Sequence, residues 1–148
     1  MSMMGTDRRI DLLKSLLASG ETADLAATVR AVDEFRADER PLDERAIREL
    51  LLVVSDEYSH VEVLGSVLGR LEVEGEWASA LLHSAAGLTR MAPEIFESYV
   101  ARALNGLSSR VQLLALVTSE TGDDVDSLLR VAKELAKNPR PRPGDSAR

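Results

Sequence analysis

Apolar residues recur along almost the whole chain at the spacing of one helix face. Near the start of the chain, for example, Ile10, Leu13, Leu16 and Leu17 would lie on the same side of an α-helix. Segments that alternate apolar and polar residues between turn residues, as half-buried strands do, are not found. The pattern therefore predicts an all-α fold.

Breaks in this periodicity divide the chain into about eight short helices. Their predicted starts lie near residues that cap or open helices: Thr6, Thr22, Pro41, Asp56, Trp77, Pro93, Gly106 and Thr121. The helix that begins near Trp77 is predicted to run unbroken to Leu88. The helix after Gly106 has Val111, Leu114 and Ala115 on its apolar face.

Short links between these helices make consecutive helices antiparallel neighbours, so the helices pair as hairpins. Hairpins of this kind can stack into a HEAT-like solenoid, in which each repeat contacts only its neighbours. No internal sequence repeat is visible at the expected period of about 40 residues. A closed helical bundle is the alternative. The helices are short and numerous and no polar centre is evident, which favours the HEAT-like stack of antiparallel hairpins.

The length of 148 residues is that of one ordinary domain. Residues 1–137 are predicted to form a single all-helical domain. The last segment, 138–148, reads NPRPRPGDSAR, and its prolines prevent the final helix from continuing. Residues 138–148 are therefore predicted to be a disordered C-terminal tail.

The chain contains no cysteine, which excludes disulfides, thiolate metal ligands and cysteine nucleophiles. Its first residues do not show the pattern of a signal peptide. No fully apolar run is longer than that from Leu50 to Val54, which is much too short to span a bilayer. These features predict a cytoplasmic protein that has no membrane partner.

The formal net charge of −7 bears on the choice of partner. The tail carries three arginines and one aspartate, so it contributes +2 and the other 137 residues contribute −9. Such acidity disfavours nucleic acid, whose phosphates need a positive surface. It favours a basic protein partner, although acidity also serves solubility alone.

One spacing suggests a metal site, because Glu57 and His60 are three residues apart, as in the Glu-x-x-His pairs of helical di-metal proteins. Such a site needs a second pair, and the only other histidine, His83, has Ala80 three residues before it. Asp56 and Glu57 are also the residue types that a helix N-terminus attracts. We therefore predict that these acids satisfy a helix start, that His60 lies at the surface, and that the protein binds no metal or cofactor.

Sequence signatures of catalysis are missing as well. The glycines form neither a phosphate-binding loop nor a dinucleotide fingerprint, and no G-x-S-x-G nucleophile elbow occurs. The carboxylates alternate with arginine and lysine, as in RADERPLDERAIRE, which is typical of a solvated helix face. The sequence predicts no catalytic residues and no enzyme activity.

The helix predicted after Asp56 carries an unusual outer face, on which small residues surround Glu62. The candidate partner-binding residues are four glutamates that would form one flat acidic ledge: Glu62, Glu72, Glu74 and Glu76. Such an acidic ledge could receive lysine or arginine side chains of a partner. The alternative is an ordinary solvated face whose small residues, such as Gly69, allow close packing.

A series of short motifs follows one another over about residues 40–136. In chain order they are Asp56-Glu57, Glu62-Val63-Leu64, Leu71-Glu72, Ala92-Pro93-Glu94, Leu104-Asn105 and Ser109-Arg110. In order and spacing they resemble the immunity protein 30 family of bacterial polymorphic toxin systems. Leu64 stands where this family commonly has methionine, and Gly106-Leu107 stands where it usually has acidic residues.

The resemblance implies a helical, HEAT-like and non-catalytic antidote that binds a cognate toxin made by the same cell or a sibling. It implies that a preformed surface occludes the toxin domain. An acidic inhibitor suits a basic toxin, for example a nuclease. A generic HEAT-like adaptor for protein interactions is the alternative function, because both functions need only a surface.

Overall fold

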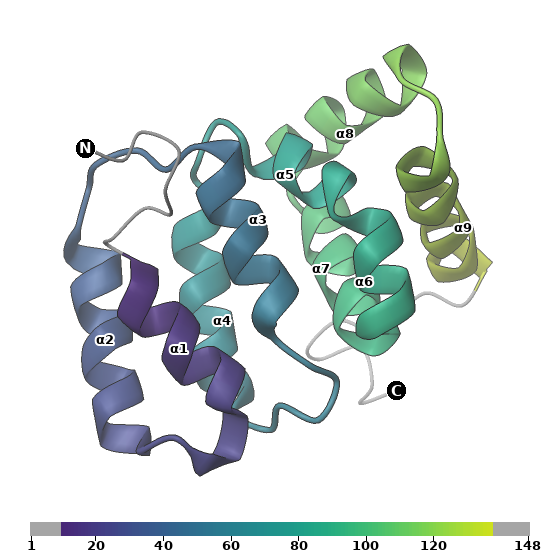
Figure 1. Ribbon diagram of the computed structural model, residues 1–148. Helices are drawn as coiled ribbons and strands as arrows, with labels where there is room; N and C mark the ends of the chain where they lie inside the picture. Colours follow the sequence, from purple (N-terminus) through teal and green to yellow (C-terminus); the bar gives the residue numbers. More distant parts are fainter. Residues whose placement is uncertain (1–9, 138–148) are drawn as a thin grey trace, which may run out of the picture.

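The computed structural model describes residues 10–137, and this range is helical apart from short links, which confirms the all-α prediction (Figure 1). The described elements are α1 (Asp11–Ser19), the 3-10 helix η2 (Gly20–Thr22), α2 (Leu25–Ala37), α3 (Glu44–Val53), α4 (Val61–Leu71), α5 (Trp77–His83), α6 (Ala85–Met91), α7 (Pro93–Asn105), α8 (Leu107–Ser119) and α9 (Asp123–Lys137). The helix start predicted at Thr6 and the predicted tail, 138–148, lie outside the described residues.

The helices form layers that succeed one another in chain order. In one row, α1 packs on α3, α3 packs on α5, and α5 packs on α8. In a second row, α2 packs on α4 and α7 packs on α9. Figure 1 shows the stack extending from α1 and α2 on the left to α9 on the right. Each helix therefore contacts mainly helices of the preceding and following layers, a packing that is consistent with a helical solenoid or a helical bundle.

Several helix starts in this stack are satisfied by carboxylates from a neighbouring helix pair. The first backbone N–H groups of a helix have no partner within the helix itself. Asp56, in the link before α4, accepts hydrogen bonds from Glu94 N (3.2 Å) and Ile95 N (2.9 Å) at the start of α7. Asp124 of α9 accepts one from Ala86 N of α6, at 2.9 Å. These bonds join residues 38 or 39 positions apart, a period of one repeat that the sequence does not display.

The fourth helix begins later than the sequence predicts. Helix α4 starts at Val61 and not near Asp56, because Asp56 is used to cap α7. The link before it contains a turn in which Tyr58 N donates to Ser55 O at 3.1 Å. The Tyr58 side chain is buried, whereas Val61 is 71% exposed.

The helix predicted from Trp77 to Leu88 is bent at Ser84 into α5 and α6. The Ser84 hydroxyl is buried and donates to Ala80 O of the preceding turn at 2.8 Å. A serine that bonds back to the helix in this way competes with the backbone ladder and bends the helix. The bend directs α5 against α3 and α8, and α6 against α7 and α9.

Helix α8 turns a different face inward from the predicted one. The sequence marks Val111, Leu114 and Ala115, but all three are exposed and Leu113 is buried instead. Apolar residues lie on nearly all sides of this helix, so their spacing cannot identify the inner side. Packing on α5 and α7 makes the choice.

The buried apolar side chains form one continuous cluster that encloses Trp77, Phe96 and Tyr99 completely. Between residues 10 and 137, none of the helices combines the length and the apolar character that crossing a bilayer requires. Because a close-packed interior resists deformation, the two rows of helices hold a fixed outer shape.

Replacing Asp56 by alanine should lower the free energy of unfolding by about 1 kcal/mol, because the start of α7 loses its acceptor. Urea unfolding followed by circular dichroism measures the change. Glu57→Ala is the matched control, since the Glu57 side chain is exposed and makes no hydrogen bond within the described range. Equal losses in both variants would show that Asp56 does not stabilise α7.

Candidate protein-interaction surface

The four glutamates of the predicted acidic ledge do not come together. Glu62 lies in the first turn of α4, whereas Glu72, Glu74 and Glu76 follow its last turn. The 11 residues of α4 separate the two positions by roughly 15 Å. The prediction of a single ledge is therefore wrong, and the four residues have separate roles.

Glu74 links two segments inside the molecule. Only 8% of its side chain is exposed, and its carboxylate forms an ion pair with Arg70 one turn earlier on α4. The carboxylate also accepts a hydrogen bond from Leu42 N at 3.0 Å, just before α3. Glu74 thus ties the turn after α4 to the link before α3.

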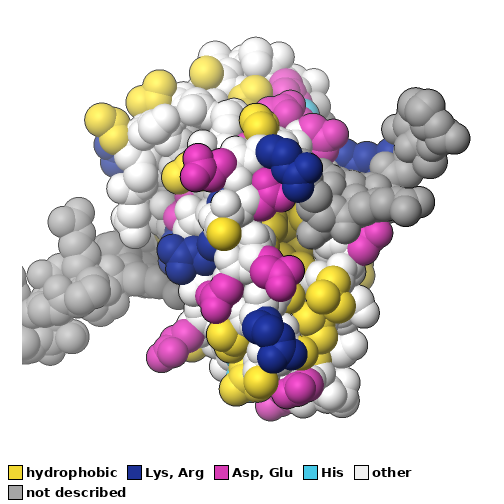
Figure 2. All heavy atoms as spheres, turned by 90° about the vertical axis from the view of Figure 1, so that its left-hand side faces the viewer, with side chains coloured by type: hydrophobic (Ala, Val, Ile, Leu, Met, Phe, Trp, Pro, Cys, Tyr) yellow, Lys and Arg dark blue, Asp and Glu magenta, His cyan; other side chains and the backbone are white. Residues whose placement is uncertain are grey.

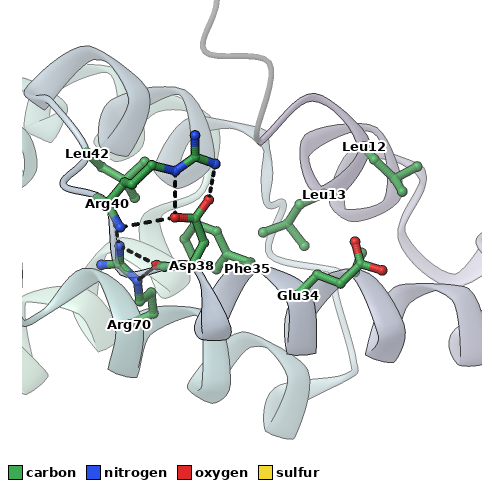
Figure 3. Close-up of a pocket in the computed structure, with 9 residues that line it drawn as sticks. Leu12, Leu13, Glu34, Phe35, Asp38, Arg40, Leu42 and Arg70 are labelled. Carbon is green, nitrogen blue, oxygen red and sulfur yellow. Dashed lines mark hydrogen bonds and ion pairs between the residues drawn. The ribbon is translucent and has the colours of Figure 1, made fainter.

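Arg70 lines a cleft of about 250 Å³ between α1, α2 and the link to α3 (Figure 3). Its guanidinium donates to Asp38 O at 3.0 and 3.2 Å and to Arg40 O at 2.9 Å. The guanidinium carbon also lies 5.6 Å from the centroid of the Phe35 ring. Figure 3 shows Leu12 of α1 on the opposite side of the cleft. Because the nitrogens of Arg70 are engaged in these bonds, the residue holds the link in place and offers little to a ligand.

Glu72 and Glu76 also make contacts within the chain. The two oxygens of Glu72 accept hydrogen bonds from Arg102 of α7, at 2.8 and 2.9 Å. Glu76 accepts one from Glu44 N, at the start of α3, at 3.1 Å. Three of the four predicted glutamates therefore fasten helix pairs to one another.

The exposed side of α4 is the remaining candidate surface, and we define the α4 face as Glu62, Gly65, Ser66 and Gly69. Glu62 is exposed and makes no hydrogen bond or ion pair with the residues that the structure describes. A Cβ atom added to Gly65 or to Gly69 would meet no atom within 4 Å. The small residues of α4 therefore do not allow close packing within the described chain, and the face is open to another molecule.

Acidic and basic side chains are mixed at the end of the stack that α2 forms, next to α4. Figure 2 shows acidic, basic and hydrophobic side chains interspersed over the end that α2 forms. Leu25 and Val29 of α2 are 47% and 43% exposed. An approaching protein would meet apolar side chains there as well as carboxylates.

The Glu57-x-x-His60 spacing does not lie on a helix. Both residues belong to the link before α4, where Glu57 is exposed and the His60 ring packs edge-on against Tyr58, with ring centroids 5.6 Å apart. Among residues 10–137, no group of three or more histidine, aspartate or glutamate side chains is placed to hold a metal ion. The helical placement predicted for this pair is therefore wrong.

A contact that the sequence did not reveal centres on His83. His83 Nδ1 lies 2.8 Å from Glu44 Oε2, and His83 Nε2 lies 2.9 Å from Glu120 Oε1. The Ser79 hydroxyl also donates to the Glu44 carboxylate. We refer to Glu44, His83 and Glu120 as the His83 bridge, which joins α3, α5 and the end of α8. The carboxylates lie 39 residues before and 37 residues after the histidine, one repeat away on either side.

The His83 bridge favours a charged imidazolium between two carboxylates. The hydrogen bonds with Glu120 and Glu44 raise the pKa of His83 above its usual value, although partial burial acts in the opposite direction. Burial raises the pKa of Glu44, but the hydrogen bonds with Ser79 and His83 outweigh burial and leave this pKa below its ordinary value. The bridge is therefore strongest when His83 is protonated and Glu44 is ionised.

The stability that the His83 bridge adds should depend on pH. Because the pKa of His83 is raised, its contribution is complete below the unfolded pKa of 6.5 and is lost as the pH rises through the folded pKa. Because the pKa of Glu44 is lowered, its contribution is present above 4.5 and is lost as the pH falls through the folded pKa. His83→Gln should therefore cost more free energy of unfolding at about pH 5.5 than at about pH 8.5. Urea unfolding at both pH values provides the comparison, and a cost that did not change with pH would contradict the bridge.

Replacing Gly65 and Gly69 together by alanine should raise the free energy of unfolding by about 1 kcal/mol or slightly more, because alanine is the better helix former. The added Cβ atoms have open space around them. Gly20→Ala is the contrasting control, since Gly20 has φ of +60° and an L side chain there is strained. Thermal unfolding measures both changes. Destabilisation by the double substitution would mean that another part of the chain covers the α4 face.

Comparisons of the chain with models of protein families, with curated proteins and with solved structures gave no match.

Proposed function

We propose that the protein is a non-catalytic immunity protein of the bacterial cytoplasm, which binds a cognate toxin domain and blocks it with a preformed surface. The observation that carries this proposal is the α4 face, where two glycines leave open space on an exposed helix. The motif resemblance to the immunity protein 30 family is the reason for proposing a toxin as the partner. The open space on the α4 face supports the proposal, because a partner could approach the helix there.

Gly65 and Gly69 lower the stability of helix α4, and no contact within the described chain explains why glycine is present at these positions. A glycine inside a helix lowers stability by roughly 0.5–1 kcal/mol relative to alanine. Neither glycine has a positive φ, and neither makes room for a neighbouring segment. Glycine on such a face does allow the backbone of a second molecule to approach closely. A partner therefore supplies a physical reason for both glycines.

Charge favours a basic partner. The chain has a net charge of −7, and Glu62 stands exposed beside the glycines of the α4 face. A lysine or arginine of the toxin could form a charge-assisted hydrogen bond with Glu62. The field of an acidic protein also accelerates its encounter with a basic one. Glu62 is therefore the proposed contact with the toxin. Glu72, Glu74 and Glu76 instead stabilise the packing of α4 on the neighbouring helices.

The stack supplies the rigidity that an inhibitor needs. The inner side of α4 is buried in the core, including Val67, Leu68 and Leu71. Glu74 and Glu76 fix the end of α4 against the start of α3. A surface that is already in its bound shape loses little conformational entropy on binding. Such a surface suits tight occlusion of a toxin domain.

The test is to measure binding between this protein and the C-terminal domain of the secreted protein encoded by the adjacent gene. Gly65→Leu/Gly69→Leu should weaken binding by about tenfold or more, because the two side chains fill the space that a partner backbone would enter. Glu62→Lys should slow association. Gly75→Leu is the matched control, since Gly75 also has open space but lies in the turn after α4.

Co-expression with the same toxin domain measures neutralisation. The natural chain and Gly75→Leu should protect cell growth, whereas Gly65→Leu/Gly69→Leu should not. Binding without protection would favour the generic HEAT-like adaptor. Absence of binding would contradict the immunity function. Equal protection by all variants would remove the α4 face from the contact and leave the function in place.

A further inference from the structure

Helix α8 exposes a line of apolar side chains at the C-terminal end of the stack, which we call the α8 stripe. Its members Leu107, Val111 and Leu114 are 68%, 57% and 65% exposed. They are spaced by four and then three residues, which is the spacing of a coiled-coil seam, so they follow one side of the helix. A contiguous row of this kind is typical of a protein contact.

An apolar groove adjoins the α8 stripe. Helices α8 and α9 diverge from the turn that joins them (Figure 1) and leave a groove of about 110 Å³, which Val100 and Leu104 of α7 also line. Leu114 belongs both to the stripe and to the lining of the groove, so the two features are continuous. The groove has room for about one branched aliphatic side chain.

Charges are distributed unevenly along the groove. Arg110 and Lys133 are exposed at the end away from the turn between α8 and α9, whereas Asp123 and Asp126 are exposed at the turn. Asp126, Leu129 and Lys133 are spaced by three and four residues and therefore share one side of α9. Arg110 is the one charged residue of α8, although 29% of the chain is charged. Arg110 therefore lies within the span of the α8 stripe, between Leu107 and Val111, whereas the acidic residues lie beyond its other end, at the turn.

We propose that the α8 stripe and the groove form the interface of a symmetric homodimer, in which α8 packs antiparallel against α8 of a second copy. In this register Val111 of each copy lies opposite Leu114 of the other, so a two-fold axis makes both contacts equivalent. The same register brings Leu107 of each copy next to Val117, which lines the groove of the other copy.

The antiparallel register also matches opposite charges. It sets the half of α8 that carries Arg110 beside the half of the partner helix that leads to Asp123 and Asp126. A parallel pair would set like charges against each other. Two copies repel over the rest of their surfaces, because each has a net charge of −7. The dimer does not use the α4 face and is therefore independent of the proposed function.

Sedimentation analysis of the full chain over a wide range of concentrations tests the proposal. We expect the mass to rise with concentration from the monomer value of 16.1 kDa towards twice that value. Val111→Glu/Leu114→Glu should remain monomeric, because the register sets the new carboxylates opposite each other. Val73→Glu/Met91→Glu is the matched control, since these side chains are 77% and 70% exposed in other parts of the molecule. The control should dimerise as the natural chain does.

Three results would overturn the proposal: a natural chain that stays monomeric, a glutamate variant at 111 and 114 that still dimerises, or a control pair that dissociates the dimer equally. Circular dichroism verifies that each variant is folded. If Val111→Glu/Leu114→Glu loses its helical signal, Leu107→Gln takes its place. Dimerisation of Leu107→Gln should be about tenfold weaker, and unchanged dimerisation would count against the interface.

Disulfide trapping tests the register directly, because the natural chain contains no cysteine. An equimolar mixture of Val111→Cys and Leu114→Cys chains should cross-link far more under mild oxidation than either variant alone. The reason is that position 111 faces position 114 only across the two-fold axis of the proposed dimer. Equal cross-linking in the mixture and in the two separate samples would overturn the antiparallel register.

Discussion

Every helix start leaves several backbone N–H groups without a partner in the helix, and this requirement governs how the helix pairs of this protein are joined. At three helix starts, acceptors come from other pairs: Asp56 serves α7, Glu76 serves α3 and Asp124 serves α6. Burial of leucine and alanine is non-directional and does not by itself select one register between neighbouring pairs. Charge-assisted bonds to helix starts have a fixed geometry. The carboxylates therefore set the register within which the aliphatic core packs.

The parts of the fold that depend on local spacing could be predicted from the sequence. Apolar positions along one side of a helix reveal its inner face, which is why the all-α fold was predicted. The start of α7 was predicted because proline favours the first turn of a helix, where Pro93 lies. Asp56 has the same local sequence whether it serves α4 or α7, so its distant use could not be predicted. His83 gives no local sign of two carboxylates one repeat away. Val111 was misleading because α8 is apolar on almost every side.

The same distinction between local and distant information applies to the residues of the candidate surface. The exposed position of Glu62 could be inferred from the periodicity of its own helix. In the sequence, Glu74 looks equally available to a partner. In the structure, however, it is buried by its ion pair with Arg70 and by the hydrogen bond that it accepts from Leu42 N. Polar groups in the turn after α4 are thus used to build the molecule. The α4 face and the α8 stripe make no such contacts within the described chain, so they remain open surface.

The bend at Ser84 has a geometric consequence for the far end of the stack. Helix α8 rests on α5 and helix α9 rests on α6, so the angle between α5 and α6 is passed on to α8 and α9. The groove exists because α8 and α9 splay apart. The break in the helix at Ser84 therefore lies one layer inward from the two helices that border the groove, and each of its two parts supports one of them.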